Sequence, residues 1–308
     1  MRRMFVLVAV AIGILFFTNV AGVYAQQGSQ AGQYVEQVGA AGAINWSSGM
    51  ITAVGVGAPP ERFYGKPQAR PMAMRAAQVD AYRKLLEVAN GVRVDATTLV
   101  RDYAVESDVV KTQVEGIVRG ARTIKTDYMS DGTVEVTVAM PISGAGTTLS
   151  QAIYPRMMET QGLPPAPTSG YPATPAVPQV PQAPQTPAPT ATTPSEVFTG
   201  LVVDARGIQA RPAMSPKIVD ENGEEVYGSM HVDREYAVQQ GMSGYARDLT
   251  AAQSNARVTN NPLTVKGMRA EGPGKSNIVI GTADANVLRA STETLTFMKK
   301  CRVMIVLD

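Results

Sequence analysis

The chain has 308 residues, with 28 Lys and Arg against 26 Asp and Glu, one His and one Cys. This length is enough for two ordinary domains with connecting segments. A balanced charge excludes a nucleic-acid-binding role, because that role needs a clustered positive surface that displaces counterions. The single Cys301 excludes an internal disulfide, so we expect folds that are stabilised by core burial alone.

Residues 1–25 have the pattern of a signal peptide. Arg2 and Arg3 precede an apolar run that ends at Phe17, and small residues come just before Gln26. This pattern predicts cleavage before Gln26 and a periplasmic or cell-surface location. The alternative is a single uncleaved membrane anchor, since the apolar run is only slightly shorter than a span. Because no cysteine lies near the cleavage site, a lipid-modified N-terminus is excluded.

Residues 26–43 are polar and small, and we expect them to form a flexible leader. A first domain is predicted at residues 44–160. It begins with an extended pattern from Ile44 to Val56, which contains Ser48-Gly49 as a bulge or bend.

The best-patterned stretch of the chain is Arg70–Asn90. Ala73, Ala77 and Ala81 fall on one face of an amphipathic helix, and Gly91 suits a left-handed cap. A face built mostly from alanine lets the helix axis lie close to a flat partner, so we expect this helix to cover a sheet.

Four further elements are predicted in the first domain: a short strand Val92–Asp95, a helix Glu106–Glu115, an antiparallel hairpin of Val118–Tyr128 and Thr133–Met140, and a weaker helix Thr147–Met158. A strand, a long helix and a hairpin together predict an α+β domain, in which the alanine-rich helix covers one face of an antiparallel sheet.

Residues 161–195 form a Pro-rich linker. Between Gly162 and Ser195 there are 11 prolines and no charged residue, a composition that favours polyproline II. Fully extended, such a segment reaches on the order of 100 Å, so the domains on either side need not touch. A ligand for proline-recognising modules is the alternative, but those modules are chiefly intracellular.

Residues 196–308 predict a second, mixed α/β domain. The expected elements are a buried strand after Phe198, a hairpin with Asn222-Gly223 at two positive-φ positions, helical stretches over 234–252 interrupted by Gly241 and Gly244, strands Leu263–Ala270 and Asn277–Ile280, a helix Asp284–Lys299 with Thr282 as its N-cap, and a terminal strand Cys301–Leu307.

Two motifs invite a catalytic interpretation. Gly272-Pro-Gly-Lys-Ser276 resembles the end of a phosphate-binding loop, but Arg269 stands where the first glycine belongs and a strand follows, so we expect a plain turn. His231 is the only histidine, and a Ser–His or Cys–His mechanism would have to use it. Without a nucleophile motif elsewhere, a surface or loop histidine is the simpler interpretation.

Three aspartates, Asp80, Asp204 and Asp284, lie near apolar segments and leave an acid–base carboxylate pair open. Caps, turns or backbone hydrogen bonds explain such residues more simply. Cys301 begins an apolar strand and is expected to be a small core residue. We assign no catalytic, cofactor-binding or metal-binding residue and no cofactor, and a zinc site is disfavoured because several His or Cys ligands are wanting.

The order of a strand, the Arg70–Asn90 helix, Gly91-Val92 and the Asp131-Gly132 hairpin resembles the domain of the bacterial 20-kDa surface lipoprotein family. That domain is shared with flagellar outer-ring and basal-disk assembly proteins. The resemblance covers about residues 44–142, and it implies a non-catalytic role in the envelope or the flagellum. The second domain resembles the C-terminal part of longer exported relatives. Because the lipobox cysteine is missing, peripheral membrane association would have to come from partners.

We therefore expect an exported, non-enzymatic protein of the cell envelope that serves as a structural or assembly component. Its partners would be envelope or flagellar proteins, or further copies of itself, and not nucleic acid. The alternative is a periplasmic ligand- or glycan-binding module, or a carboxylate-dependent hydrolase, in the C-terminal domain.

Overall fold

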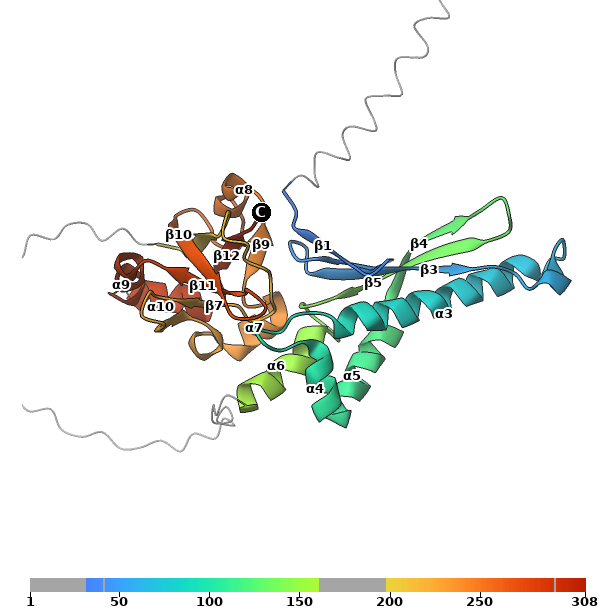
Figure 1. The fold of residues 1–308 in the computed structure, drawn as a ribbon, viewed down its shortest axis with the longest axis horizontal. Coiled ribbons are helices and arrows are strands. Elements are labelled where there is room, and N and C mark those ends of the chain that lie inside the picture. Colours follow the sequence, from blue (N-terminus) through green and yellow to red (C-terminus); the bar gives the residue numbers. More distant parts are fainter. Residues whose placement is uncertain (1–31, 41, 161–197, 291) are drawn as a thin grey trace, which may run out of the picture.

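The computed structural model describes residues 32–40, 42–160, 198–290 and 292–308, which build an α+β protein with two sheets (Figure 1). The expected signal peptide, most of the expected leader and the Pro-rich segment lie outside the described residues. We call residues 32–160 the N-terminal unit and residues 198–308 the C-terminal unit. Within the described ranges, no helix has the length and apolar character needed to span a membrane.

The N-terminal unit contains a five-stranded antiparallel sheet with the order β1-β2-β3-β5-β4. Its strands are β1 (Val35–Val38), β2 (Gly42–Asn45), β3 (Met50–Gly57), β4 (Arg122–Tyr128) and β5 (Val134–Pro141). The expected bend at Ser48-Gly49 is the turn between β2 and β3, where Gly49 has φ +65°. The register shifts between Thr123 and Lys125, so β4 is bulged beside β5.

The long helix α3 (Ala69–Asn90) covers one face of this sheet, as the alanine periodicity predicts (Figure 1). Ala73, Ala77 and Ala81 are fully buried. A Cβ added to Gly55 of β3 would lie 2.2 Å from the Ala77 carbonyl oxygen, so sheet and helix backbones are in direct contact. The prediction of a left-handed cap is wrong, because Gly91 has φ −84° and remains in the helical region.

The other elements of the N-terminal unit are a short 3-10 turn η1 (Glu61–Phe63) and three helices: α4 (Val100–Glu106), α5 (Asp108–Arg119) and α6 (Leu149–Thr160). The helix predicted at 106–115 corresponds to α5, which begins two residues later and extends to Arg119, whereas α4 was not predicted. The Ser107 hydroxyl accepts from the Val110 amide and starts a new helix there. The expected short strand Val92–Asp95 is reduced to one bridge between Arg93 and Leu99.

The expected leader is wrong at its C-terminal end, because β1 pairs with β2 from Val35↔Asn45 to Val38↔Gly42. Tertiary contacts order this polar segment. Glu36 accepts hydrogen bonds from the Trp46 indole at 3.0 Å and from the Arg93 guanidinium at 2.6 Å. Such partners are distant in sequence, and composition alone does not reveal them.

The C-terminal unit contains a seven-stranded mixed sheet with the order β8-β7-β11-β10-β6-β12-β9. Its strands are β6 (Gly200–Asp204), β7 (Lys217–Val219), β8 (Glu225–Tyr227), β9 (Gly244–Ala246), β10 (Pro262–Glu271), β11 (Asn277–Ile280) and β12 (Val303–Val306). The four neighbours β10, β6, β12 and β9 are parallel. Every residue of β6 and β12 is buried, as expected for parallel strands that are covered on both faces.

The helical elements of this unit are a 3-10 turn η2 (Ser229–His231), α7 (Arg234–Gln240), α8 (Leu249–Gln253), α9 (Thr282–Ala290) and α10 (Thr292–Lys299). Two predictions need correction. The stretch 234–252 contains the strand β9 between its helices, and in the β7–β8 hairpin Gly223 has positive φ whereas Asn222 does not.

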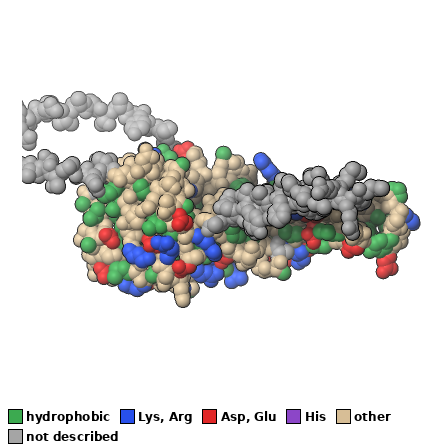
Figure 2. Space-filling view, turned by 90° about the horizontal axis from the view of Figure 1, so that it is seen from above, with side chains coloured by type: hydrophobic (Ala, Val, Ile, Leu, Met, Phe, Trp, Pro, Cys, Tyr) green, Lys and Arg blue, Asp and Glu red, His purple; other side chains and the backbone are tan. Residues whose placement is uncertain are grey.

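The two units are packed together, so the expectation that they need not touch is wrong. The backbone amides of Met214 and Ser215 donate to the carbonyls of Arg93 and Val94, at 2.9 and 2.7 Å. Buried residues of both units belong to one continuous hydrophobic core. On the face seen in Figure 2, Lys and Arg side chains are interspersed with Asp and Glu.

Candidate binding site between the two units

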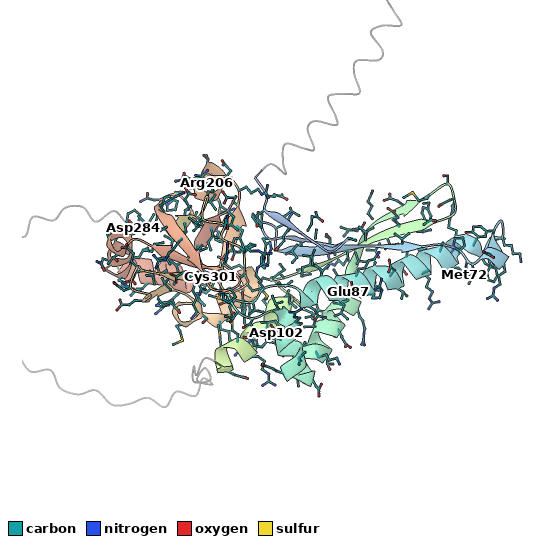
Figure 3. All side chains as sticks on the ribbon, viewed as in Figure 1. Met72, Glu87, Asp102, Arg206, Asp284 and Cys301 are labelled. Atoms are coloured by element: carbon teal, nitrogen blue, oxygen red, sulfur yellow. The ribbon has the colours of Figure 1, made fainter. Side chains whose placement is uncertain are left out.

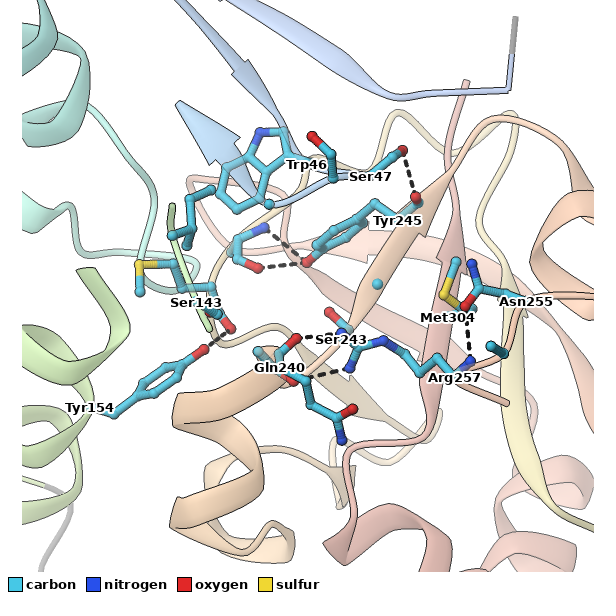
Figure 4. Close-up of a pocket in the computed structure, with 18 residues that line it drawn as sticks. Trp46, Ser47, Ser143, Tyr154, Gln240, Ser243, Tyr245, Asn255, Arg257 and Met304 are labelled. Atoms are coloured by element: carbon cyan, nitrogen blue, oxygen red, sulfur yellow. Dashed lines mark hydrogen bonds between the residues drawn. The ribbon is translucent and has the colours of Figure 1, made fainter. Parts of the chain in front are cut away.

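A cavity of about 430 Å³ lies where the two units meet (Figure 4). The N-terminal unit supplies the β2–β3 turn, the residues after β5, and α6. The C-terminal unit supplies the segment before β7, the stretch from the end of α7 through β9, the loop after α8, and β12. The lining residues are Trp46, Ser47, Ser48, Gly49, Ile142, Ser143, Tyr154, Ala213, Met214, Gln240, Gly241, Ser243, Gly244, Tyr245, Asn255, Ala256, Arg257 and Met304.

An aromatic pair forms one end of this interface cavity. The rings of Trp46 and Tyr245 meet edge to face, with their centroids 5.7 Å apart and an angle of 72°. The Ser47 hydroxyl donates to the Tyr245 carbonyl at 2.6 Å. Because Trp46 and Ser47 belong to the N-terminal unit and Tyr245 to the other, these contacts hold the cavity wall across the interface.

Two buried tyrosines anchor the segment before β7. Tyr154 donates its hydroxyl to the Met214 carbonyl at 2.7 Å, and Tyr245 donates to the Ala213 carbonyl at 2.6 Å. Burial raises the pKa of Tyr245 to about 12 and raises that of Tyr154 still further. Both phenols are therefore neutral at physiological pH, and they act as hydrogen-bond donors.

An ion-pair cluster fastens the units beside the cavity. Arg93 and Arg211 contact Glu36 at 2.6 and 2.9 Å, and the Arg93 Nε–H donates to the Pro212 carbonyl at 2.8 Å. Burial alone would raise the pKa of Glu36, but hydrogen bonds from Arg93, Trp46 and Arg211 lower it below its ordinary value. Glu36 is therefore ionised at neutral pH and joins both units.

Arg257 is the only charged side chain in the lining. Its guanidinium donates to the backbone carbonyls of Gln240, Gly241 and Cys301, the last two at 3.1 and 2.9 Å. Burial lowers the pKa of Arg257, and no carboxylate of the described residues forms an ion pair with it. These carbonyl oxygens accept from three of its five N–H groups without neutralising its charge, so this end of the cavity is electropositive.

Ser243 and Gly244 lie beside this arginine. The Ser243 hydroxyl oxygen is buried without a partner in hydrogen-bonding geometry, although it is near enough to Tyr245 to oppose the rise in that phenol's pKa. A Cβ on Gly244 would lie 3.1 Å from the Arg257 Nε and 2.4 Å from the Met304 sulfur. The missing side chain therefore lets the Met304 sulfur and the guanidinium pack against this part of β9.

The three aspartates singled out in the sequence do not meet. Asp80 on α3 contacts Lys84 at 2.7 Å and accepts from the Val56 amide; burial opposes these partners, but together they lower its pKa to about 2. Asp204 at the end of β6 is paired with Arg206 and Lys266, and the Arg206 hydrogen bonds hold its pKa well below the usual range.

Asp284 lies in the first turn of α9, and Figure 3 shows it apart from Arg206, the partner of Asp204. His231 is partly exposed at the end of η2, with its Nδ1 3.3 Å from a Glu225 oxygen. Cys301 is fully buried, and burial raises the pKa of its thiol to about 12. Its core placement confirms the prediction.

The segment Gly272–Ser276 is the turn between antiparallel β10 and β11, which confirms the expectation of a plain turn. The Gly274 amide donates to the Ala96 carbonyl at 2.7 Å, so this turn touches the N-terminal unit. Among the described residues, no group of three or more His, Cys, Asp or Glu side chains could hold a metal ion.

The sequence analysis did not identify the cavity residues. Its closest signal was the Gly241–Gly244 interruption, which was interpreted only as a break in a helix. No sequence motif marks Arg257. Its position depends on the packing of α7, β12 and the loop after α8, which are separate in the sequence.

Residues 200–308 match the model of the family described as the second domain of Tp0624 from Treponema pallidum, a bacterial domain family without an assigned function. The match covers the C-terminal unit and none of residues 44–142. No curated protein matches the chain.

Proposed function

We propose that this protein is an exported, non-enzymatic component of the cell envelope that assembles with partner proteins through the outer end of its N-terminal unit. The observation that carries this proposal is a group of exposed apolar side chains at that end, which we call the tip. Its members are Tyr64, Tyr128 and Met129, with exposed fractions of 53, 50 and 41%.

The tip projects away from the C-terminal unit (Figure 1). It combines the segment before α3 with the end of β4 and the β4–β5 turn, and Gly132 in this turn lies beside the Tyr64 ring. Gathered, solvent-exposed apolar side chains on a soluble fold mark interaction surfaces, whereas scattered single ones do not. Because the tip lies at the end of the N-terminal unit that is far from the C-terminal unit, a partner can reach it while the two units stay packed together.

Local contacts hold the tip in place. The Arg70 guanidinium lies 4.9 Å from the centroid of the Tyr128 ring, and the Tyr128 hydroxyl contacts the Met74 sulfur at 3.8 Å. A cavity of about 390 Å³ lies between the start of α3 and the β4–β5 turn, with Lys66 and Arg70 in its wall. Aromatic rings beside cations favour a partner segment that carries both apolar and acidic side chains.

Export is proposed from the signal-peptide pattern of residues 1–25, and it implies a periplasmic or cell-surface location. The flagellar version of the proposal rests on the resemblance of residues 44–142 alone. Neither carboxylates nor histidine line the interface cavity, so the hydrolase alternative finds no catalytic pair there.

The test is complementation of a deletion strain. A Tyr64→Ser, Tyr128→Ser double variant should fold normally, as measured by circular dichroism. It should nevertheless dissociate from the envelope fraction and fail to restore swimming to the deletion strain. The matched control is Val105→Ser with Val109→Ser, which removes two exposed apolar side chains on α4 and α5, away from the tip. A deletion strain that swims normally, together with a protein that fractionates as a free periplasmic monomer, would contradict the proposal.

A further inference from the structure

The interface cavity has the features of a ligand site, and this inference does not depend on the tip. Its volume of about 430 Å³ falls within the range of small-molecule pockets. Both units supply its walls, so a bound molecule would contact the two at once (Figure 4).

The charge of Arg257 is uncompensated. Arg257 is partly buried, and a cation removed from water is costly to the extent that no anion or full set of hydrogen bonds stabilises it. The titratable groups packed around it are Tyr154, Tyr227, Tyr245 and Cys301, and burial keeps all four protonated and uncharged at neutral pH. The cavity therefore offers a fixed positive charge at low dielectric to any anion that enters.

Two guanidinium donors remain for such an anion. A guanidinium has five N–H groups, and Arg257 gives two from Nη1 and one from Nη2 to backbone carbonyls. The Nε–H and one Nη2–H have no acceptor among the described residues. The five N–H groups lie in the guanidinium plane, and the Nε–H shares one edge of it with an Nη2–H; an edge of two parallel donors matches the two oxygens of a carboxylate.

A second observation also points to a ligand. The Ser243 hydroxyl lines the cavity and is buried without a well-formed hydrogen bond. Buried polar groups are almost always satisfied, so an unsatisfied hydroxyl beside an unpaired cation indicates a missing partner. Gly244 is not in the left-handed region, so its backbone does not require glycine. A side chain at this position would crowd the Arg257 Nε and displace the Met304 sulfur.

The remaining lining describes the body of the ligand. Ser48, Ser143, Gln240 and Asn255 supply polar side chains, and Trp46 with Tyr245 supplies an aromatic end. We propose that the interface cavity binds a small hydroxylated carboxylate, with its carboxylate on Arg257 and Ser243 and its hydroxylated carbons directed toward Trp46.

The probe is gluconate, and the reporter is the fluorescence of Trp46, the only tryptophan in the chain. Gluconate should give a saturable change at or below ~10 mM, a concentration that would fill a site with a Kd of ~1 mM. Sorbitol, which has the same carbon chain without the carboxylate, should give no change.

The variants assign the response to the cavity. Arg257→Lys keeps the charge but loses the two-donor edge, and Gly244→Ala places a Cβ 3.1 Å from Nε and 2.4 Å from the Met304 sulfur, which must move. Each should weaken gluconate binding by about tenfold or more, and Ser243→Ala by about threefold. The controls are Arg101→Lys and Ser130→Ala, both at exposed positions outside the cavity. Gly244→Ala and Ser243→Ala keep the test valid if Arg257→Lys fails to fold.

Three results would overturn the proposal. One is the absence of any saturable gluconate response in the unaltered protein. Another is an equal response to sorbitol, which would remove the carboxylate assignment. The last is unchanged gluconate binding in the folded cavity variants.

Discussion

The sheets of the two units differ in how many of their faces are covered. In β3 of the N-terminal unit, buried and partly exposed residues alternate, because α3 covers one face and the other face is open. In β6 and β12 of the C-terminal unit every residue is buried. A one-sided sheet leaves surface for partners, whereas a two-sided sheet forms a rigid base against which the interface cavity is built.

The largest loss of stability is expected from a substitution at the closest contact between β3 and α3. Gly55→Ala places a Cβ 2.2 Å from the Ala77 carbonyl oxygen and the Ala81 amide nitrogen, so the backbones of β3 and α3 must separate. We expect a loss of about 4 kcal/mol or more in the free energy of unfolding, measured by urea denaturation. Gly116→Ala is the control, because a Cβ there meets nothing within 4 Å and a helical alanine should stabilise slightly. Equal stability of the two variants would refute the contact.

Truncations compare the two sheets directly. Ile305→Ala in β12 removes a side chain that is buried between two covered faces, and we expect a loss of about 3 kcal/mol. Met50→Ala in β3 removes a partly exposed side chain and should cost less than about 1.5 kcal/mol. Both values come from the same denaturation experiment. A larger loss for Met50→Ala would mean that the open face of β3 is covered.

The Glu36 cluster tests how the units are joined. The pKa of Glu36 is lower in the folded state than its ordinary value, so its stabilisation is complete above that value and is lost as the pH falls through the folded pKa. Glu36→Gln should cost about 2 kcal/mol at pH 7, because two arginines lose their shared carboxylate.

The same substitution should flatten the acid side of the stability profile. Below the folded pKa of Glu36, where the native carboxyl is itself protonated, the unaltered protein and the Gln variant should converge. Unfolding midpoints measured from pH 7 to pH 3 would show this. A constant difference over the whole range would mean that the loss comes from packing and not from charge.

The smallest change in stability is expected from a substitution on the outer surface of α3. Arg83 is exposed and pairs with Asp80 and Glu87 along the helix, an arrangement that solvent screens. Arg83→Ala should leave the unfolding midpoint unchanged within error. A clear destabilisation would show that this face is not free surface and would weaken the contrast between the two units.

The local hydrophobic pattern predicted those elements that bury one face against any apolar surface, without needing a particular partner residue. The alanine period located α3 within one residue, and β11 was predicted at its observed bounds, because burial of one face is visible in such stretches. The strand β1 was missed, since Glu36 is held by Arg93 and Arg211, which lie far along the chain. The strand β9 was missed because its glycine resembles a helix break.

The candidate site could not have been predicted in the same way. Its lining comes from several separated segments of both units, and their meeting depends on how the sheets pack. Arg257 in sequence is an ordinary polar residue after a short helix. Only the convergence of the Gln240, Gly241 and Cys301 carbonyls gives it a fixed position and an unpaired charge.

The bulge in β4 bears on how copies of this protein behave when they are crowded. As an edge strand, β4 presents unpaired backbone groups that could template further strands. The register shift at Ile124 interrupts the regular spacing of those groups, and Lys125 adds a charge on the same edge. Both features oppose sheet extension from one chain to the next. The β4 edge therefore resists pairing with another chain, although the tip at its end displays apolar side chains.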